Sequence, residues 1–513
     1  MLAKRLCLVL AFVGFSSYIT AQESFSGSSG EFLISTSKKM RHSFIYKGIK
    51  VRTPSALYAV RAYFPDEDPE YVVEKYDLEF NCLAETKGTI LLNKVKGQDE
   101  NFKFFELCAK GSELVLLSEF QDVEKGQAKI ILQEISSESL DKIGDAQTLI
   151  EIKHRKKKDV DPGTFEYRQS PDGNINAVLF RYPGVFPKQQ IVAHVYDSNW
   201  NLLYSNTQFL GKRIDFFEFL DWHITDSAEV HVLAKEYLKF GPDESYRDQI
   251  NYTLNHYQFN EPMRPIKSNV DIESNYLVSV SSRFASDGNL IIAAAVANES
   301  QGYPSKLMCI RFSPNDRAII SKSFIPIPED SIKRELKNGG SEYRFFSKPE
   351  ILFNPDGSFW VLTERHAVKT NVHRTEDYRV DYTTKWYHNY GVLVAIFNSQ
   401  GEGEWFRSIH KRQISKGYHK SNSYFAFTGD SSLHMMYLTM DPDVIISRRP
   451  KLRLVNHTTL RRTGEYSNEY LWNLKETEVI PYFKDAFQLK NGFFCAPLRL
   501  SSGERAYLYQ NLD

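Results

Sequence analysis

Cysteine, net charge and long apolar runs are all scarce in this chain of 513 residues, and each scarcity argues against a class of protein. The five cysteines show no close Cys-x-x-Cys spacing, which argues against a zinc site. Basic and acidic side chains number 64 each, so nothing attracts nucleic acid or anionic lipid over long range. No apolar run beyond the N-terminus approaches the roughly 18 residues of a membrane-spanning helix. We therefore expect no nucleic-acid partner, no membrane span, no metal and no organic cofactor.

Local signatures of common hydrolases are missing as well. The sequence contains neither a Gly-x-Ser-x-Gly elbow nor a His-Glu-x-x-His helix. Glycoside hydrolysis needs two carboxylates about 5–9.5 Å apart, and no spacing here identifies such a pair. Ionisable residues do stand beside predicted strand ends, in Asp221-Trp222-His223 and Glu364-Arg365-His366, and we interpret both as structural. The catalytic residues are thus unknown, and the balance leans away from an enzyme.

The first 21 residues predict a secretory signal peptide. Lys4 and Arg5 precede a short apolar core, Leu6 to Phe15, and a small-residue stretch that ends with predicted cleavage after Ala21. Removing this segment leaves 62 basic and 64 acidic residues. We expect residues 22–513 to form a single exported, soluble domain, either periplasmic or extracellular.

Export permits disulfides, and four cysteines remain after cleavage: Cys82, Cys108, Cys309 and Cys495. Each lies in or beside an apolar run, where a free thiol behaves as a small apolar group. If one disulfide forms, Cys82 with Cys108 is the pair that neighbouring repeats would favour. The disulfide state stays open at this point.

A turn recurs along the chain at a near-constant period. Gly or Ser, preceded by Asp, Asn or Lys, separates two short apolar runs at Lys47-Gly48, Lys110-Gly111, Asp172-Gly173, Asp226-Ser227, Asp287-Gly288, Asp356-Gly357, Asp430-Ser431 and Asn491-Gly492. The flanking runs are β-branched or aromatic and too short for amphipathic helices, so each turn predicts a β-hairpin. A second polar turn follows in most units, as in Val195 to Leu203. Two hairpins per period of roughly 60 residues give a four-stranded antiparallel unit.

Radial repetition of such units predicts an all-β fold, a β-propeller of four-stranded antiparallel blades. Eight blades are favoured; seven is the alternative if Lys47-Gly48 belongs to an irregular lead-in. The last unit lacks an outer strand, which Glu31 to Ser35 could supply. Both termini would then close the ring and leave no blade with a free edge.

Three of the turns carry a family resemblance. Gln169-Ser170-Pro171-Asp172-Gly173-Asn174, Phe353-Asn354-Pro355-Asp356-Gly357-Ser358 and Ala285-Ser286-Asp287-Gly288-Asn289 resemble the strand–SPDG–strand hairpins of TolB-like propeller repeats. With its signal segment, the chain is similar to secreted bacterial propeller proteins. These motifs are structural, so the resemblance implies a fold and export and brings no catalytic residue.

The two ends of such a propeller differ in what they offer. The tight turns lie at one end and have little chemistry, whereas long and varied loops lie at the other: Arg181 to Gln190, Glu236 to Gln249, Pro328 to Pro349, Ala367 to Tyr390, His410 to Ser423 and Met440 to Lys451. Function commonly sits on such loops. The segment Ala367 to Tyr390 has little strand pattern and the aromatic, Arg and His content of a recognition surface. Its candidate binding residues are Arg374, Tyr378, Tyr382, Trp386, Tyr387 and His388.

Three hypotheses about function remain. The favoured one is a non-catalytic binding or scaffold propeller that presents its long loops to a protein partner. The alternative is a carbohydrate-binding protein or polysaccharide-acting enzyme with a site over the central channel, since aromatic side chains also suit sugar rings. The third is a structural component of the cell envelope.

Overall fold

The computed structural model describes most of the chain after residue 22. The described residues are 23–27, 30–34, 44–63, 70–78, 82–89, 101–122, 126–153, 163–182, 190–209, 216–238, 250–259, 265–273, 275–298, 304–328, 345–374, 381–411, 413–416, 423–429, 432–440, 452–473, 480–481, 486–488, 493–499 and 505–511. In this part of the chain, no helix is long and apolar enough to span a lipid bilayer.

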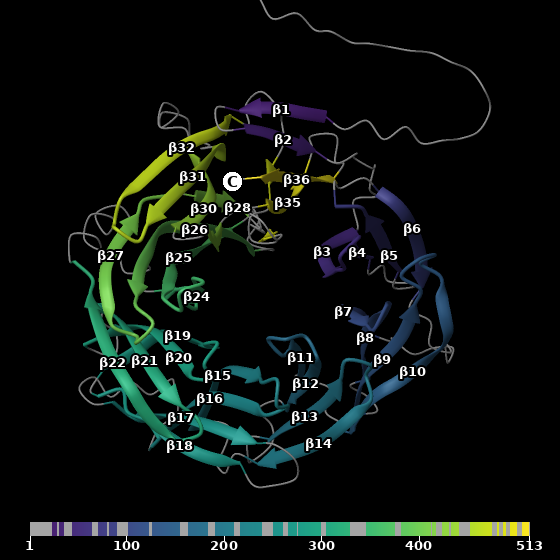
Figure 1. Cartoon of the computed structure of the whole chain (residues 1–513), viewed down its shortest axis with the longest axis horizontal. Coiled ribbons are helices and arrows are strands. Elements are labelled where there is room, and N and C mark those ends of the chain that lie inside the picture. The colour runs from purple at the N-terminus through teal and green to yellow at the C-terminus, as the bar shows by residue number, and fades with distance from the viewer. Residues whose placement is uncertain are drawn as a thin grey trace, which may run out of the picture.

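The described strands form antiparallel sheets arranged in a ring (Figure 1). Seven sheets are built on four strands that follow one another in the chain, and we number them blades 1 to 7. Blades 1 to 3 consist of β3 (Phe44–Arg52), β4 (Leu57–Tyr63), β5 (Glu70–Tyr76), β6 (Cys82–Thr89), β7 (Asn101–Lys110), β8 (Glu113–Asp122), β9 (Gln127–Ile135), β10 (Lys142–Lys153), β11 (Thr164–Gln169), β12 (Ile175–Arg181), β13 (Gln190–Asp197) and β14 (Leu202–Phe209).

The next blades continue around the ring. Blades 4 and 5 consist of β15 (Phe217–Ile224), β16 (Val230–Tyr237), β17 (Tyr252–Phe259), β18 (Ile266–Val270), β19 (Tyr276–Phe284), β20 (Leu290–Ala297), β21 (Lys306–Ser313) and β22 (Ala318–Pro326). Blades 6 and 7 consist of β23 (Phe345–Phe346), β24 (Glu350–Phe353), β25 (Phe359–Arg374), β26 (Asp381–Phe397), β27 (Gly403–Ile409), β28 (Gln413–Lys416), β29 (Tyr424–Thr428), β30 (Ser432–Met440), β31 (Leu452–Arg461) and β32 (Tyr466–Asn473). In blades 1 to 5 the first strand lies innermost in the ring (Figure 1).

An eighth sheet joins the two ends of the chain. It contains β1 (Glu23–Gly27), β2 (Gly30–Ile34), β33 (Ile480–Pro481), β34 (Phe487–Gln488), β35 (Phe493–Arg499) and β36 (Arg505–Asn511). β2 pairs with β36 through Leu33 and Tyr509, which confirms that the N-terminal strand completes the last unit. The all-β propeller is therefore confirmed: seven blades are built from consecutive strands, the number given as the alternative, and the terminal sheet joins the two ends of the chain.

Tight turns connect the first two strands of each blade because their residues suit the left-handed backbone region. In blade 3, Gly173 has φ +78° and donates its N–H to the Ser170 carbonyl at 3.0 Å. Gly288 and Gly357 repeat this geometry in blades 5 and 6. Only glycine adopts this region without steric cost, so the Asp-Gly pairs locate these turns correctly.

The other predicted turns do not all match the structure. Lys47-Gly48 is not a turn: it lies inside β3 at a register irregularity, and the blade 1 turn is closed by Thr53 and Ala56. Asp430-Ser431 and Asn491-Gly492 lie outside the described residues. In blade 4 the left-handed residue is Ala228, one position after the predicted Ser227.

The apolar core lies between the blades. Every residue of β20 is buried, because this strand packs against neighbours on both of its faces. One cluster joins blades 5 and 6 and includes Cys309, and another joins blades 2 and 3 and includes Cys108. Cys82, Cys108 and Cys309 are free thiols, so the candidate pair of Cys82 with Cys108, left open by the sequence, is not bonded. Cys108 and Cys309 are buried and act as small apolar side chains.

The antiparallel order places the connections at two ends of the ring. Turns from first to second strand and from third to fourth strand share one end, which we call the tight-turn end. The described strand ends that lead into the remaining connections lie at the opposite end. The central residues of five of the predicted long loops, 183–189, 239–249, 329–344, 417–422 and 441–451, lie outside the described residues.

Candidate functional site

A pocket of about 910 Å³ opens at the tight-turn end of the ring. Its walls come from four consecutive blades, where the inner strands β11, β15, β19 and β24 run into their turns. Arg168, His223, Arg283 and Phe353 line it, together with the turn residues that follow them. The expectation that this end has little chemistry is therefore wrong. Short turns leave the ends of the inner strands open, and the side chains of those strands supply the polar groups.

Two positions of the inner strands carry most of this chemistry. Counted back from the first turn residues Ser170, Thr225, Ala285 and Asn354, each blade contributes one residue at each position. The second residue before the turn is Arg168, His223, Arg283 or Leu352. The fourth is Glu166, Asp221, Ser281 or Glu350. We call the second position before the turn the basic position and the fourth the acidic position. Residues two apart in a strand share a face, so the two positions lie side by side in each blade.

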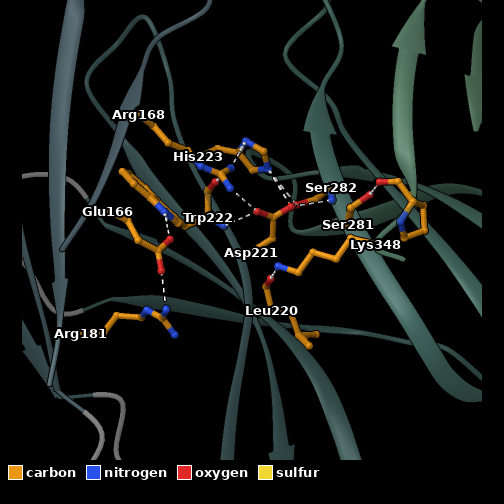
Figure 2. Close-up of polar contacts among 11 residues, drawn as sticks. Glu166, Arg168, Arg181, Leu220, Asp221, Trp222, His223, Ser281, Ser282 and Lys348 are labelled. Atoms are coloured by element: carbon orange, nitrogen blue, oxygen red, sulfur yellow. Dashed lines mark hydrogen bonds and ion pairs between the residues drawn. The ribbon is translucent and has the colours of Figure 1, made fainter. Parts of the chain in front are cut away.

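The contact between blades 3 and 4, which we call joint 3/4, is closed by an ion pair (Figure 2). Arg168 Nη2 lies 2.6 Å from Asp221 Oδ1, and Nη1 donates to the Trp222 carbonyl. Asp221 Oδ2 also accepts the Ser282 N–H at 2.9 Å. Asp221 is buried, while the Arg168 side chain is 34% exposed. One carboxylate thus ties three blades together.

The surroundings of Asp221 decide its protonation. Burial alone would raise the pKa of Asp221. Hydrogen bonding and charge from His223, the Arg168 guanidinium and the Ser282 N–H outweigh burial, so this pKa lies well below its usual range. The carboxylate is therefore ionised at neutral pH and acts as an acceptor only.

Asp221, His223 and Ser282 do not form a catalytic triad. Arg168 Nη1 lies 3.2 Å from His223 Nδ1, and because a guanidinium only donates, Nδ1 must be the accepting nitrogen. The ring proton then sits on Nε2, which is 2.9 Å from Ser282 Oγ and 3.7 Å from Asp221 Oδ2. A serine nucleophile needs an unprotonated nitrogen facing its hydroxyl and the carboxylate on the other nitrogen. Both conditions fail here.

Trp222 is the buried aromatic residue of joint 3/4. It is almost fully buried, and its Nε1 donates to Glu166 Oε2 at 2.8 Å. Arg181 pairs with the other oxygen of Glu166 at 2.5 Å. The Arg168 guanidinium lies 5.3 Å from the Trp222 ring centroid, within the range of a cation–π contact. Every charged group of this joint has an opposite charge or a ring beside it (Figure 2).

The contact between blades 5 and 6, which we call joint 5/6, repeats the geometry without the ion pair. Arg283 Nη1 donates to the Ile351 carbonyl at 2.7 Å, as Arg168 does to the equivalent Trp222. Glu350 stands where blade 4 has Asp221. Within the described residues, however, no carboxylate lies in ion-pair distance of Arg283. Its guanidinium is 5.7 Å from the Phe353 ring centroid, and the residue is exposed in the pocket.

Glu350 also has Tyr424 as a neighbour. The Tyr424 hydroxyl lowers the pKa of Glu350 against the larger effect of burial, and the Tyr424 ring lies 5.5 Å from Lys411 Nζ. Lys411 is fully buried and forms an ion pair with Glu364, which Asn389 and other neighbours also contact. Burial raises the pKa of Glu350 to about 7, although the Tyr424 hydrogen bond and the Arg283 charge act against it. The carboxyl group of this joint is therefore half neutral near pH 7.

The predicted motifs Asp221-Trp222-His223 and Glu364-Arg365-His366 thus take part in these two polar networks. The sequence reasoning missed Arg168, Arg283, Glu350 and Lys411. For the first three a signal existed, because they occupy fixed distances before the recurring turns. No such register identifies Lys411. In the described part of the chain, no group of three or more His, Cys, Asp or Glu side chains is placed to hold a metal ion.

Five of the six predicted binding residues lie at the opposite end, on a hairpin instead of a loop. β25 and β26 are 16 and 17 residues long and pair continuously from His366 to Arg374, so the absence of strand structure predicted for this segment is wrong. Tyr378 lies outside the described residues. The register places Tyr382, Trp386 and His388 at alternate positions of β26. Arg374, opposite Asp381, and Tyr387 belong to the other set of positions.

Comparison with known proteins finds no matching family model and no similar curated protein. Among solved structures, the chain is similar to the polysaccharide lyase Uly1, with 8% identity, a TM-score of 0.37, and coverage of 82% of this chain and 94% of that chain. It is similar to the β-propeller domain of the trilobed protease from Pyrococcus furiosus, with 10% identity, a TM-score of 0.33, and coverage of 84% and 98%. An endo-arabinase from Bacteroides thetaiotaomicron has 11% identity, a TM-score of 0.23, and coverage of 55% and 94%. Likeness at this level carries no functional argument.

Proposed function

We propose that the protein is an exported, non-catalytic binding propeller that presents the β25–β26 hairpin to a protein partner. The observation that carries this proposal is the length of the hairpin. β24 pairs with β25 only over Phe359–Leu362, and β27 pairs with β26 only from Val392 onward. β28 adds a short edge at 386–389. Residues 367–374 and 381–385 therefore form a ribbon that, among the described strands, pairs only with itself.

Such a ribbon needs support from something other than its own pairing. Two-stranded hairpins are marginally stable in water, and exposed strand edges invite pairing with another chain. A partner that packs against the ribbon meets both needs. The reversed serine–histidine geometry at the other end of the ring supports the non-catalytic part of the proposal.

The register supplies a matched pair of variants for the test. Trp386 and Tyr387 are adjacent aromatic residues of β26 next to the ribbon, where β28 pairs with β26, and they occupy alternate positions of the hairpin. If the face with Tyr382, Trp386 and His388 is the binding face, Trp386→Ala should lose about 2 kcal/mol of affinity, roughly thirtyfold, as truncation of a central anchor does. Tyr387→Ala should change affinity by less than about threefold and is the control.

The measurement starts with partner capture from the cell envelope by wild type and both variants. Surface plasmon resonance with the purified partner follows. Circular dichroism must show that each variant keeps the wild-type melting temperature. Equal affinities for wild type and Trp386→Ala would remove this face from the proposal, and hydrolysis of a peptide or glycan by wild type would remove the non-catalytic part.

The pocket at the tight-turn end favours a second candidate, carbohydrate binding at the end of the central channel. Its volume of about 910 Å³ lies in the range of small-ligand sites. Its lining combines aromatic rings with carboxylate and amide groups that accept or donate hydrogen bonds to hydroxyls. Isothermal titration with a neutral and an acidic sugar tests this candidate independently of the hairpin.

A further inference from the structure

In joint 5/6 the Arg283 guanidinium can bind a ligand, whereas in joint 3/4 the Arg168 guanidinium is already paired. Arg168 and Arg283 each donate to a carbonyl of the next blade and each lie near a ring. Arg168 is also neutralised by Asp221 at 2.6 Å. The carboxyl group equivalent to Asp221, that of Glu350, does not lie within ion-pair distance of Arg283 and has Tyr424 beside it. Arg283 is therefore oriented by its neighbours while part of its guanidinium faces the pocket.

The acidic residues of the pocket rim already have partners. Asp226 accepts the Asp172 N–H at 3.0 Å, Asp287 pairs with Arg311, and Asp356 pairs with Arg462 at 2.5 Å. All three are exposed, so they retain lone pairs for hydroxyl groups. Their negative charge also opposes a ligand with several charges. The rim thus selects for hydroxyls and against polyanions.

We propose that this pocket binds a sugar acid, a polyhydroxylated ligand with one carboxylate, through Arg283. The carboxylate pairs with the free side of the guanidinium in the bidentate manner that its planar fork favours. Phe353 covers an apolar face of the sugar ring beside it, and the rim carboxylates accept its hydroxyls. This inference rests on the second candidate function, carbohydrate binding at the channel end, and names the class of sugar.

Charge near Arg283 should tune this binding. Glu350 of β24 faces Arg283, and Tyr424 of β29 faces Glu350. Glu364 and Lys411 lie near Tyr424 and therefore act on Glu350 through it. Protonation of Glu350 removes the negative charge nearest to Arg283. A sugar carboxylate stays ionised between pH 6 and 8, so its affinity should rise as pH falls across this interval.

The experiment is isothermal titration of the full chain with galacturonate, its neutral counterpart galactose, trigalacturonate and inorganic phosphate. We expect galacturonate to bind, galactose to bind at least about tenfold more weakly, and Arg283→Met to lose about tenfold or more of galacturonate affinity. Arg317→Met, an exposed arginine of a blade 5 turn outside the pocket lining, is the matched control and should bind as wild type. Glu350→Gln should bind equally at pH 6 and pH 8.

The ligands separate the possible outcomes. Trigalacturonate carries three carboxylates, so it should bind no more tightly than galacturonate; this result identifies a free sugar acid as the ligand and supports the proposal. Tighter binding of trigalacturonate would overturn it, because the rim would then not select against polyanions. Galactose binding as tightly as galacturonate would overturn it while leaving carbohydrate binding intact. Phosphate binding as tightly as galacturonate, unchanged affinity in Arg283→Met, or no binding of any of the sugars would also overturn it. The last result would remove the second candidate function too.

Discussion

Joints 3/4 and 5/6 are two copies of one arrangement that end in different states. In both, an arginine two residues before a turn reaches across to a carbonyl of the next blade, near an acidic residue on that blade. Joint 3/4 closes, because Asp221 is short and Ser282 and Arg168 surround it with donors. Joint 5/6 stays open, because the longer Glu350 side chain lies beside Tyr424 and not within ion-pair distance of Arg283.

The difference separates structure from function within one repeat position. In a closed joint the charged groups pair with one another across the blades, which holds neighbouring blades in fixed positions. In the open joint the Arg283 guanidinium can bind a ligand, and the charge of the Glu350 carboxyl group changes near neutral pH. The same pattern in the sequence therefore serves stability in one place and recognition in the other.

The largest expected effect separates the two arginines. Arg168→Met leaves the buried Asp221 carboxylate without its cation and should lower the free energy of unfolding by about 2–3 kcal/mol. Because the Arg168 side chain is 34% exposed, the effect should stay below the range for fully buried pairs. Arg283→Met should lower it by about 0.5–1.5 kcal/mol, since the hydrogen bond to the Ile351 carbonyl is lost but no ion pair is. Urea denaturation of both variants measures the difference.

A control shows that charge and not chain packing carries the effect. Combining Arg168→Met with Asp221→Leu removes both charges, so the double variant should recover part of the stability lost in Arg168→Met. Equal losses in Arg168→Met and Arg283→Met would erase the distinction between the joints.

The fold followed from the sequence where turn chemistry is local. Asp-Gly pairs at Gly173, Gly288 and Gly357 mark left-handed positions that glycine alone occupies freely. Lys47-Gly48 failed because glycine in a strand also marks a bulge, and no local feature separates the two roles. The ribbon of β25 and β26 was missed because its alternation is interrupted by polar residues on both strands.

The candidate site followed less well, because it depends on register between blades that are far apart in sequence. The basic and acidic positions become visible only when the turns are aligned on their first residue, and in blade 4 the left-handed residue Ala228 hides that alignment. Whether an acid meets the neighbouring base is set by a third residue, such as Tyr424, on another blade. Nothing near Glu350 in the sequence indicates that contact.

The pH dependence of stability should have opposite signs at the two joints. Glu350 has a pKa of about 7 in the folded protein, above its ordinary value of about 4.3. Between these values only the folded state keeps the proton, so stability falls as pH rises, by at most about 1.4 kcal/mol per pH unit. Glu350→Gln should abolish this fall. Asp221 has a lowered pKa, so its contribution is present above about pH 3.9 and is lost below it.

Denaturation of wild type, Glu350→Gln and Asp221→Asn from pH 3 to 8 measures both contributions. Buried histidines add a common background: burial lowers the pKa of His256 to about 3 and of His457 to about 4, so both reduce stability as pH falls below about 6.5. This background cancels in the difference between variant and wild type. A Glu350→Gln profile parallel to wild type between pH 4.5 and 7 would contradict the raised pKa.

The smallest expected effect comes from converting the open joint into a closed one. Tyr424→Phe keeps the ring beside Lys411 but removes the hydroxyl that lies beside Glu350 and lowers its pKa. Glu350 should then turn toward Arg283, as Asp221 does toward Arg168, and the new ion pair should offset the loss of the hydroxyl. The free energy of unfolding at pH 8 should change by less than about 1 kcal/mol. The pKa of Glu350, followed by the carboxyl carbon shift in NMR, should fall toward its ordinary range because a cation now faces it. Galacturonate affinity should fall with it, since the guanidinium is no longer free. A Glu350 pKa that stays near 7 in this variant would show that Tyr424 is not what keeps the joint open.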